Sequence, residues 1–173
     1  MSADELVAIY DPAARSARVT GTAPRSTVRR ENLPHAATCV VVRRSNGEVL
    51  VHRRSDAKDV YPGLRDCSFG GVVLAGEDPD VAAVRELEEE AGAAGALLTP
   101  VGSAWYRDEH TWYLGFVYRT SWDGAIRFDD GEVAAAWWEA PEVVAAALVD
   151  PSSPFVPDTR ALLTTMGIDA VFG

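Results

Sequence analysis

The stretch from Gly71 to Ala93 reads GVVLAGEDPDVAAVRELEEEAGA and contains the clearest structural pattern in the sequence. Asp78 is a suitable N-cap, and Pro79 suits the first helical position because the N–H that it lacks would have no partner there. Gly92 is a suitable C-terminal stop, because glycine readily adopts the left-handed conformation that ends many helices. We therefore predict a helix over Pro79–Ala91.

Three glutamates of this predicted helix project from one face. Successive residues turn by about 100° around a helix, which places Glu86, Glu89 and Glu90 together. Like charges one turn apart repel by about 0.2–0.5 kcal/mol, and a divalent cation would relieve that repulsion. Carboxylates are donors that Mg²⁺ and Mn²⁺ prefer, although many Glu-rich helix faces are simply solvated. On the opposite face we expect an apolar stripe that packs on the core, made by Val81, Val84, Leu87 and Ala91.

Predicted strands and helices lie on both sides of this helix. Apolar or alternating runs bounded by turn residues predict strands. The predicted strands are 36–42, 48–52, 68–74, 97–106, 111–120 and 134–139, the further helices are 141–148 and 158–166, and residues 5–21 are a candidate antiparallel pair. This order predicts a mixed α/β fold in a single domain over 1–173, with 1–34 as an N-terminal extension whose hairpin packs on it.

The composition excludes several classes of function. The 173 residues carry 26 acidic and 16 basic side chains, a formal net charge of −10, which argues against binding to a nucleic acid polymer. No apolar run approaches the ~18 residues of a membrane span, and the acidic N-terminus does not resemble a signal peptide. Two cysteines imply no disulfide framework, so we expect a cytoplasmic location. Cys39 is expected to be buried, and Cys67 to be partly exposed near the site.

The fixed positions of the 71–93 stretch match the Nudix box, G-x5-E-x7-R-E-U-x-E-E-x-G-U, in which U is aliphatic. Every fixed position is satisfied, with Ala93 as a small final member. The chain therefore resembles the Nudix hydrolase family from about His35 to Glu139. The resemblance implies an α/β/α sandwich around a mixed β-sheet, with the box as a loop–helix–loop. It also implies metal-dependent hydrolysis of a nucleoside diphosphate derivative or related organic pyrophosphate, in which water attacks phosphorus.

The resemblance also implies roles for the charged residues of the box. Mg²⁺ or Mn²⁺ would be the cofactor, with Glu89 and Glu90 as usual ligands and Glu86 as a ligand or general base. Arg85 would orient the carboxylates by pairing with Glu77 or Glu89. Homodimers are common among relatives, so a homodimer is a further expectation.

Residues around these glutamates are candidates for holding the metal ion or the substrate. Gly70 and Gly71 lack a Cβ, so the backbone there can come close to a ligand or a metal ion, and Gly71 is a candidate metal contact. Many family members recruit a further carboxylate outside the box. Glu132 is our candidate for it, with an exposed loop acid as the alternative reading.

The segment 52–63, HRRSDAKDVYPG, resembles the R-R-x3-K-x2-W/Y-P-G string of type I isopentenyl diphosphate isomerases. This likeness implies Arg54 and Lys58 as diphosphate contacts. Isomerase chemistry itself is not expected, because Gly70 stands where the isomerases have their cysteine and Cys67 lies three residues too early. Three alternatives stay open: an isomerase on the same scaffold, a nucleotide- or metabolite-binding domain without catalysis, and a domain that a divalent cation merely stabilises.

Overall fold

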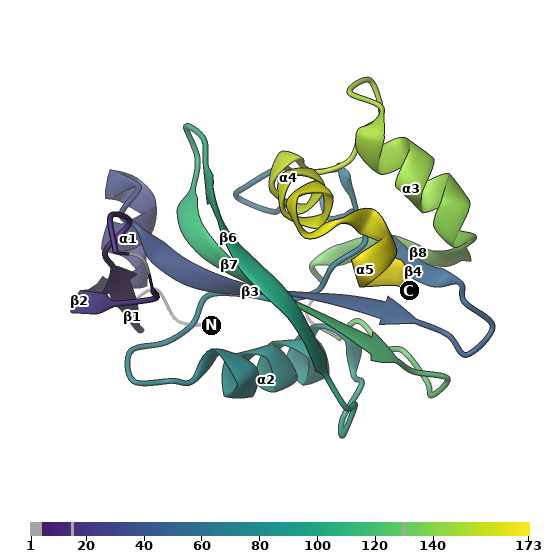
Figure 1. Cartoon of the computed structure of the whole chain (residues 1–173), viewed down its shortest axis with the longest axis horizontal. Helices are drawn as coiled ribbons and strands as arrows, with labels where there is room; N and C mark the ends of the chain where they lie inside the picture. The colour runs from purple at the N-terminus through teal and green to yellow at the C-terminus, as the bar shows by residue number, and fades with distance from the viewer. Residues whose placement is uncertain (1–4, 15, 130) are drawn as a thin grey trace.

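A mixed β-sheet forms the centre of the molecule (Figure 1). The computed structural model describes residues 5–14, 16–129 and 131–173. Within them this sheet has six strands in the order β5-β4-β3-β7-β6, with β8 paired to β4. The pair β3 and β7 is parallel, and the other pairs are antiparallel. The strands are β3 (His35–Arg43), β4 (Val49–Arg54), β5 (Arg65–Asp66), β6 (Thr99–Arg107), β7 (Trp112–Ser121) and β8 (Val133–Glu139).

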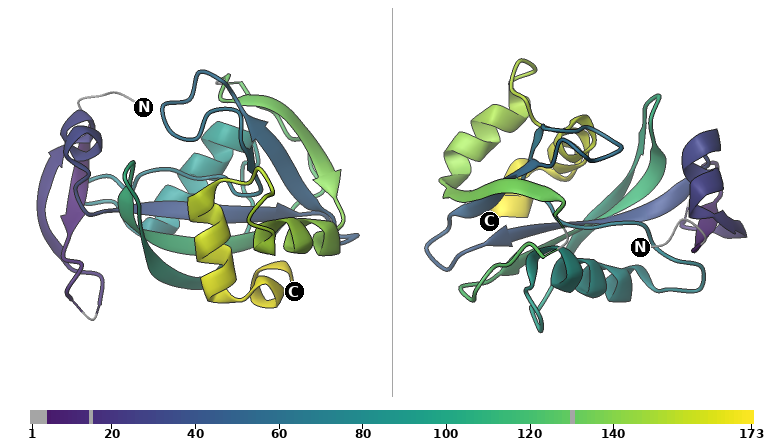
Figure 2. Two further views of the ribbon diagram at one scale, coloured as in Figure 1. Left: turned by 90° about the horizontal axis from the view of Figure 1, so that it is seen from above. Right: turned by 180° about the vertical axis from the view of Figure 1, so that it is seen from behind.

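Helices cover both faces of the sheet, α2 on one side and α3, α4 and α5 on the other, as Figures 1 and 2 show. Successive side chains of a strand point to opposite faces, and β3 is apolar on both. Val40 and Val42 pack in the α2 layer, whereas Cys39 and Val41 pack in the other layer. The predicted α/β/α sandwich is therefore confirmed. The helices are α2 (Pro79–Ala91), α3 (Pro141–Val149), α4 (Pro157–Met166) and α5 (Ile168–Phe172).

Helix α2 has the predicted bounds, Pro79–Ala91. The Asp78 side chain accepts a hydrogen bond from the backbone N–H of Asp80 at 2.9 Å, which satisfies one of the free donors of the first turn. Gly92 ends the helix with a φ of 67°. Local capping signals were therefore sufficient to predict both ends of this helix.

The apolar stripe predicted for α2 is correct at Leu87 and Ala91, which are buried, and wrong at Val81 and Val84, which are 60 % and 40 % exposed. Small alanines instead let the helix lie close to the sheet, and this orientation carries Glu86 inward. Glu86 and Glu90 therefore border the interior, whereas Glu89 remains exposed. The buried apolar face consists of Ala82, Ala83, Leu87 and Ala91.

The N-terminal segment forms a separate two-stranded ribbon and a short helix at one end of the molecule (Figure 2). Strands β1 (Leu6–Tyr10) and β2 (Val19–Pro24) agree with the candidate antiparallel pair, and Val7 and Ala8 are buried. Helix α1 (Arg25–Glu31) was not predicted, because its N-cap makes no side-chain bond and only Val28 of its residues is buried. No helix of the described residues has the length and hydropathy needed to span a membrane.

Two further expectations, between residues 67 and 74, are wrong. Residues 68–74 make isolated bridges, such as Val40 with Phe69, and not a continuous strand, because the backbone at Gly70 has a φ of 155° that a regular ladder does not accommodate. Cys67 is fully buried and not partly exposed, since it packs in the core layer of α3–α5. Both features lie in the segment that leads into α2.

Candidate active site

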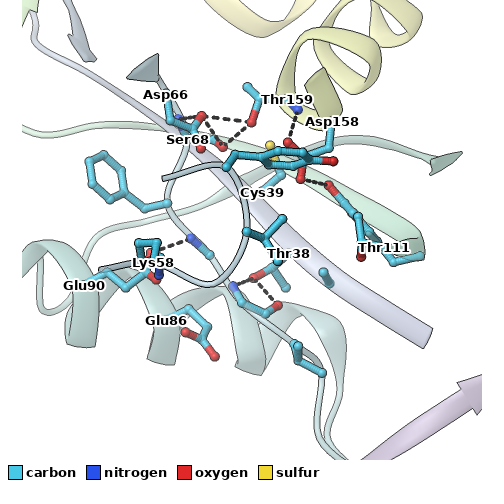
Figure 3. A pocket seen from close by; sticks show the side chains of 18 of the residues that line it. Thr38, Cys39, Lys58, Asp66, Ser68, Glu86, Glu90, Thr111, Asp158 and Thr159 are labelled. Carbon is cyan, nitrogen blue, oxygen red and sulfur yellow. Dashed lines mark hydrogen bonds between the residues drawn. The ribbon is translucent and has the colours of Figure 1, made fainter. Parts of the chain in front are cut away.

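A cavity of about 290 Å³ is lined by residues of α1, α2, α4 and the strands β3, β4, β5, β7 and β8, together with loops between them. In Figure 3, Glu86 and Glu90 project from α2 on one side, and Asp66, Ser68, Asp158 and Thr159 lie on the opposite side. Arg85 is not among its lining residues. The predicted site residues that line the cavity are Arg54, Lys58, Gly70, Gly71, Glu86, Glu89, Glu90 and Glu132.

Arg85 holds Glu77 in a two-pronged ion pair beside the cavity. Its Nε and Nη2 donate to Oε1 and Oε2 of Glu77 at 2.8 and 2.9 Å. This hydrogen bonding keeps the pKa of Glu77 below its ordinary value, so the carboxylate stays ionised. Glu77 also accepts from the backbone N–H of Leu74 at 3.0 Å. Arg85 therefore pairs with both expected partners. Glu77 accepts the two hydrogen bonds from Nε and Nη2, and Oε2 of Glu89 lies 3.5 Å from Nη1.

Glu86 is the most deeply buried acid of the cavity, with 1 % of its surface exposed. Burial raises its pKa, and the Arg85 Nη1 donor 2.7 Å from Oε1 acts in the opposite direction. A Cβ at Gly71 would lie 2.6 Å from the carboxylate carbon of Glu86. Gly71 therefore makes room for a carboxylate, which is a physical reason for a glycine at this position.

Glu90 lies next to this buried acid and is held by the loop before the helix. Its Oε2 accepts the backbone N–H of Gly70 at 2.8 Å. Burial raises the pKa of Glu90 to about 8, against the opposing effects of the Gly70 N–H and the Lys58 charge. Glu89 is more open, with 53 % of its side chain exposed. At this end of the cavity burial therefore disfavours the ionised forms of Glu86 and Glu90.

The two cations expected to contact a diphosphate both line this cavity, and each has a protein partner. Lys58 donates to Glu132. Burial would raise the pKa of Glu132, but the bond and charge of Lys58 bring it below its ordinary value. Arg54 donates to the carbonyl of Val60 at 3.0 Å, and its Nη1 lies 3.9 Å from Asp66.

The opposite end of the cavity has a buried polar network that the sequence did not indicate. Asp66 Oδ1 accepts from the Thr159 hydroxyl at 2.8 Å, and Asp158 Oδ2 accepts from the Tyr113 hydroxyl at 3.0 Å. Burial, together with the charge of Asp66, raises the pKa of Asp158 to about 6. The network joins the β5 end, β7 and the start of α4, so no local pattern could reveal it.

The raised pKa of Asp158 predicts that the free energy of unfolding falls as the pH rises. Because the carboxyl has a pKa of about 6 in the folded chain against an ordinary value of 3.8, its favourable contribution is present below pH 4 and is lost as the pH rises through 6. Relative to D158N, the unaltered chain should lose roughly 2–3 kcal/mol of unfolding free energy between pH 4 and 7. Denaturant titrations across this range measure it. D169N removes an exposed carboxylate, so its unfolding free energy should change with pH as that of the unaltered chain does. The same pH dependence of unfolding free energy in D158N and in the unaltered chain would contradict the prediction.

The chain that forms this cavity is similar in sequence and in fold to known proteins. The family model described as "NUDIX domain" matches residues 33–159. A Rhodococcus erythropolis protein described as "Uncharacterized Nudix hydrolase orf19" is 41% identical over 172 residues, which cover 93% of this chain and 91% of that protein. The Salmonella typhi protein "Uncharacterized Nudix hydrolase YfcD" is 34% identical over 145 residues, covering 84% of this chain and 77% of that protein. The crystal structure of DR0079 from Deinococcus radiodurans superposes with a TM-score of 0.73 and 20% identity, covering 98% of this chain and 100% of that chain.

Proposed function

Because the chain belongs to the Nudix hydrolase family, we propose that it cleaves the diphosphate linkage of a nucleoside diphosphate derivative or related organic pyrophosphate, with water attacking phosphorus. The observation that carries the proposal is a single cavity lined by acids, Glu86, Glu90 and Glu132, and by cations, Arg54 and Lys58. Carboxylates are donors for a divalent cation, and fixed cations bind phosphate oxygens. A chain of net charge −10 can thereby accept an anionic substrate.

The donor chemistry of the cavity fits Mg²⁺ or Mn²⁺. Burial raises the pKa of Glu86 and of Glu90, so a cation beside them would favour the ionised forms of both. Among the residues that the structure describes, no three acidic, histidine or cysteine side chains are gathered closely enough to hold an ion as they stand. Metal binding therefore requires these carboxylates to draw closer together, and each uses only one of its two oxygens on Arg85 or on the Gly70 N–H. When bound, such an ion activates water and neutralises phosphate charge.

The remaining charged residues position these groups and the substrate. Lys58 is paired with Glu132, so a diphosphate that takes the Lys58 ammonium leaves the Glu132 carboxylate available to the cavity as a further acid. Arg85 holds Glu77 from outside the cavity lining and contacts the buried Glu86. We propose that Arg85 acts by orienting these carboxylates and not by touching the substrate.

The cysteines weigh against the isomerase alternative. Burial raises the pKa of Cys67 well above its ordinary value and that of Cys39 to about 12. Cys67 has no exposed surface, and Gly70 carries no side chain at all. Neither thiol is therefore suited to exchange protons with an alkene, whereas every glutamate of the box is present.

A substrate screen tests the proposal. With Mg²⁺ or Mn²⁺, we expect phosphate or nucleotide release from at least one class among nucleoside di- and triphosphates, dinucleotide polyphosphates, nucleotide sugars, NADH and coenzyme A. EDTA should abolish the release. Turnover of none of these classes would overturn the hydrolase proposal. Binding without turnover would indicate a metabolite-binding domain, and a loss of thermal stability in EDTA without binding or turnover would indicate a structural cation.

A further inference from the structure

The cations around the cavity differ in whether the fold supplies each with a carboxylate partner. Arg29, Arg54 and Lys58 each have one within 4.0 Å, namely Asp59, Asp66 and Glu132. Arg25 also lines the cavity, and among the described residues no carboxylate pairs with it. Its Nε, like that of Arg54, is buried and has no hydrogen-bond partner. A buried donor without a partner costs free energy, and Arg25 stands out because it combines such a donor with the absence of a carboxylate partner in the described chain.

Helix α1, which carries Arg25, is fixed against the rest of the molecule. Val28 is buried, and the Asn32 side chain donates to the carbonyl of Asp108 at 2.9 Å. The backbone N–H of Arg25 donates to the carbonyl of Glu5 at 2.9 Å. The base of the Arg25 side chain is therefore anchored by contacts to the residue before β1 and to the turn between β6 and β7.

The Arg25 charge acts on acids from two different parts of the cavity. On α2 it opposes the rise that burial gives to the pKa of Glu86, and before β8 it acts with Lys58 and Arg54 to lower the pKa of Glu132. It makes no ion pair within 4.0 Å with either of them in the described chain. The guanidinium is thus near the acids that we assign to catalysis, but its donors remain available.

We propose that Arg25 binds a phosphate oxygen of the substrate, so that the N-terminal segment completes the diphosphate site. A guanidinium offers planar, paired N–H donors that match phosphate oxygens, and a phosphate would satisfy the donor that the fold leaves unpaired. Arg25 lies outside the region 33–159 that matches the family model. The identity of this ligand rests on the proposed function, whereas the anion-binding role can be measured without turnover.

A different role for Arg25 would be to offset the repulsion among the glutamates. The two roles predict different effects of R25Q. Removing a positive charge beside the acids should leave Mg²⁺ binding equal or tighter in both cases. Only the phosphate-binding role predicts weaker binding of an anion, and that weakening cannot then result from a lost metal ion.

The test uses the full chain with Mg²⁺ and methylenediphosphonate, an analogue of pyrophosphate that is not hydrolysed, in calorimetric titrations. R25Q should weaken binding of the analogue about 10- to 100-fold, the range for a lost charged hydrogen bond. R25K retains the charge and should recover part of this loss. R30Q removes a cation of the same helix that is paired with Glu31, and it should bind within about twofold of the unaltered chain. Thermal denaturation checks that all variants fold.

The outcomes separate this inference from the proposed function. R25Q binding within twofold of the unaltered chain, or an equal weakening by R30Q, would overturn the role of Arg25 whether or not the chain hydrolyses any substrate. Failure of the unaltered chain to bind the analogue would also overturn it. Weaker binding by R25Q together with no turnover in the substrate screen would support Arg25 as an anion-binding residue and overturn the hydrolase proposal alone.

Discussion

Replacing Glu90 with glutamine is expected to abolish Mg²⁺-dependent turnover while the fold stays intact. The change removes one of the carboxylates that we assign to the metal ion, and the loss should be about 100-fold or more. The glutamine Oε1 can still accept the Gly70 N–H that Glu90 accepts at 2.8 Å. Because burial raises the pKa of Glu90 to about 8, a neutral side chain imposes no new desolvation cost there.

Glu88 provides the matched control for this experiment. It belongs to the same helix but is exposed and does not line the cavity, so E88Q should keep nearly full activity. Steady-state rates over a range of Mg²⁺ concentrations, with thermal denaturation of each variant, measure both effects. If E90Q keeps more than about a tenth of the activity, Glu90 does not belong to the metal site.

Replacing Gly70 with alanine is expected to produce the largest loss of stability, about 3 kcal/mol or more. The backbone φ of 155° at Gly70 belongs to a region that side chains rarely adopt, and a Cβ there would overlap the carbonyl oxygen of Thr38 on β3. The collision is with backbone, so no rotamer change relieves it. Any shift of the loop would also displace the N–H that holds Glu90.

A substitution at Gly76 distinguishes the effect of backbone strain from that of a steric collision. It also has a positive φ, 79°, but a Cβ there would meet nothing within 4 Å. G76A should therefore cost only about 1–2 kcal/mol, the strain of the left-handed conformation. Denaturant titrations compare the two variants. Equal losses for G70A and G76A would show that the approach of Gly70 to Thr38 does not matter for stability.

The box helix illustrates how far local sequence reasoning extends. The bounds of α2 could be predicted because Asp78, Pro79 and Gly92 act through bonds to residues within one turn. The buried face of α2 could not be predicted in full, because the helix has apolar residues on more than one face. Whether Val81 or the alanines are buried depends on how closely the sheet approaches the helix. The same choice buried Glu86, which the helical wheel had placed on the face opposite the core.

The lining of the cavity shows a similar division. Glu89, Glu90 and Lys58 were identified from motifs, and the structure brings them to one cavity, whereas Arg85 of the same box lies outside its lining. Asp158 and Arg25 were not identified, because neither belongs to a motif. Each contributes only after α4 or α1 has packed beside residues far away in the chain.

The sequence by itself determined the bounds of the box helix and the carboxylate chemistry that this helix carries, because these depend on capping, periodicity and residue type over a few consecutive positions. The sandwich fold was implied by the family motif that lies within the same stretch. Only the tertiary structure decided that Cys67 is buried, that Asp66 and Asp158 share one network, and that Arg25 reaches the cavity. Burial and long-range pairing depend on which surfaces meet, and that is decided by the packing of the whole core.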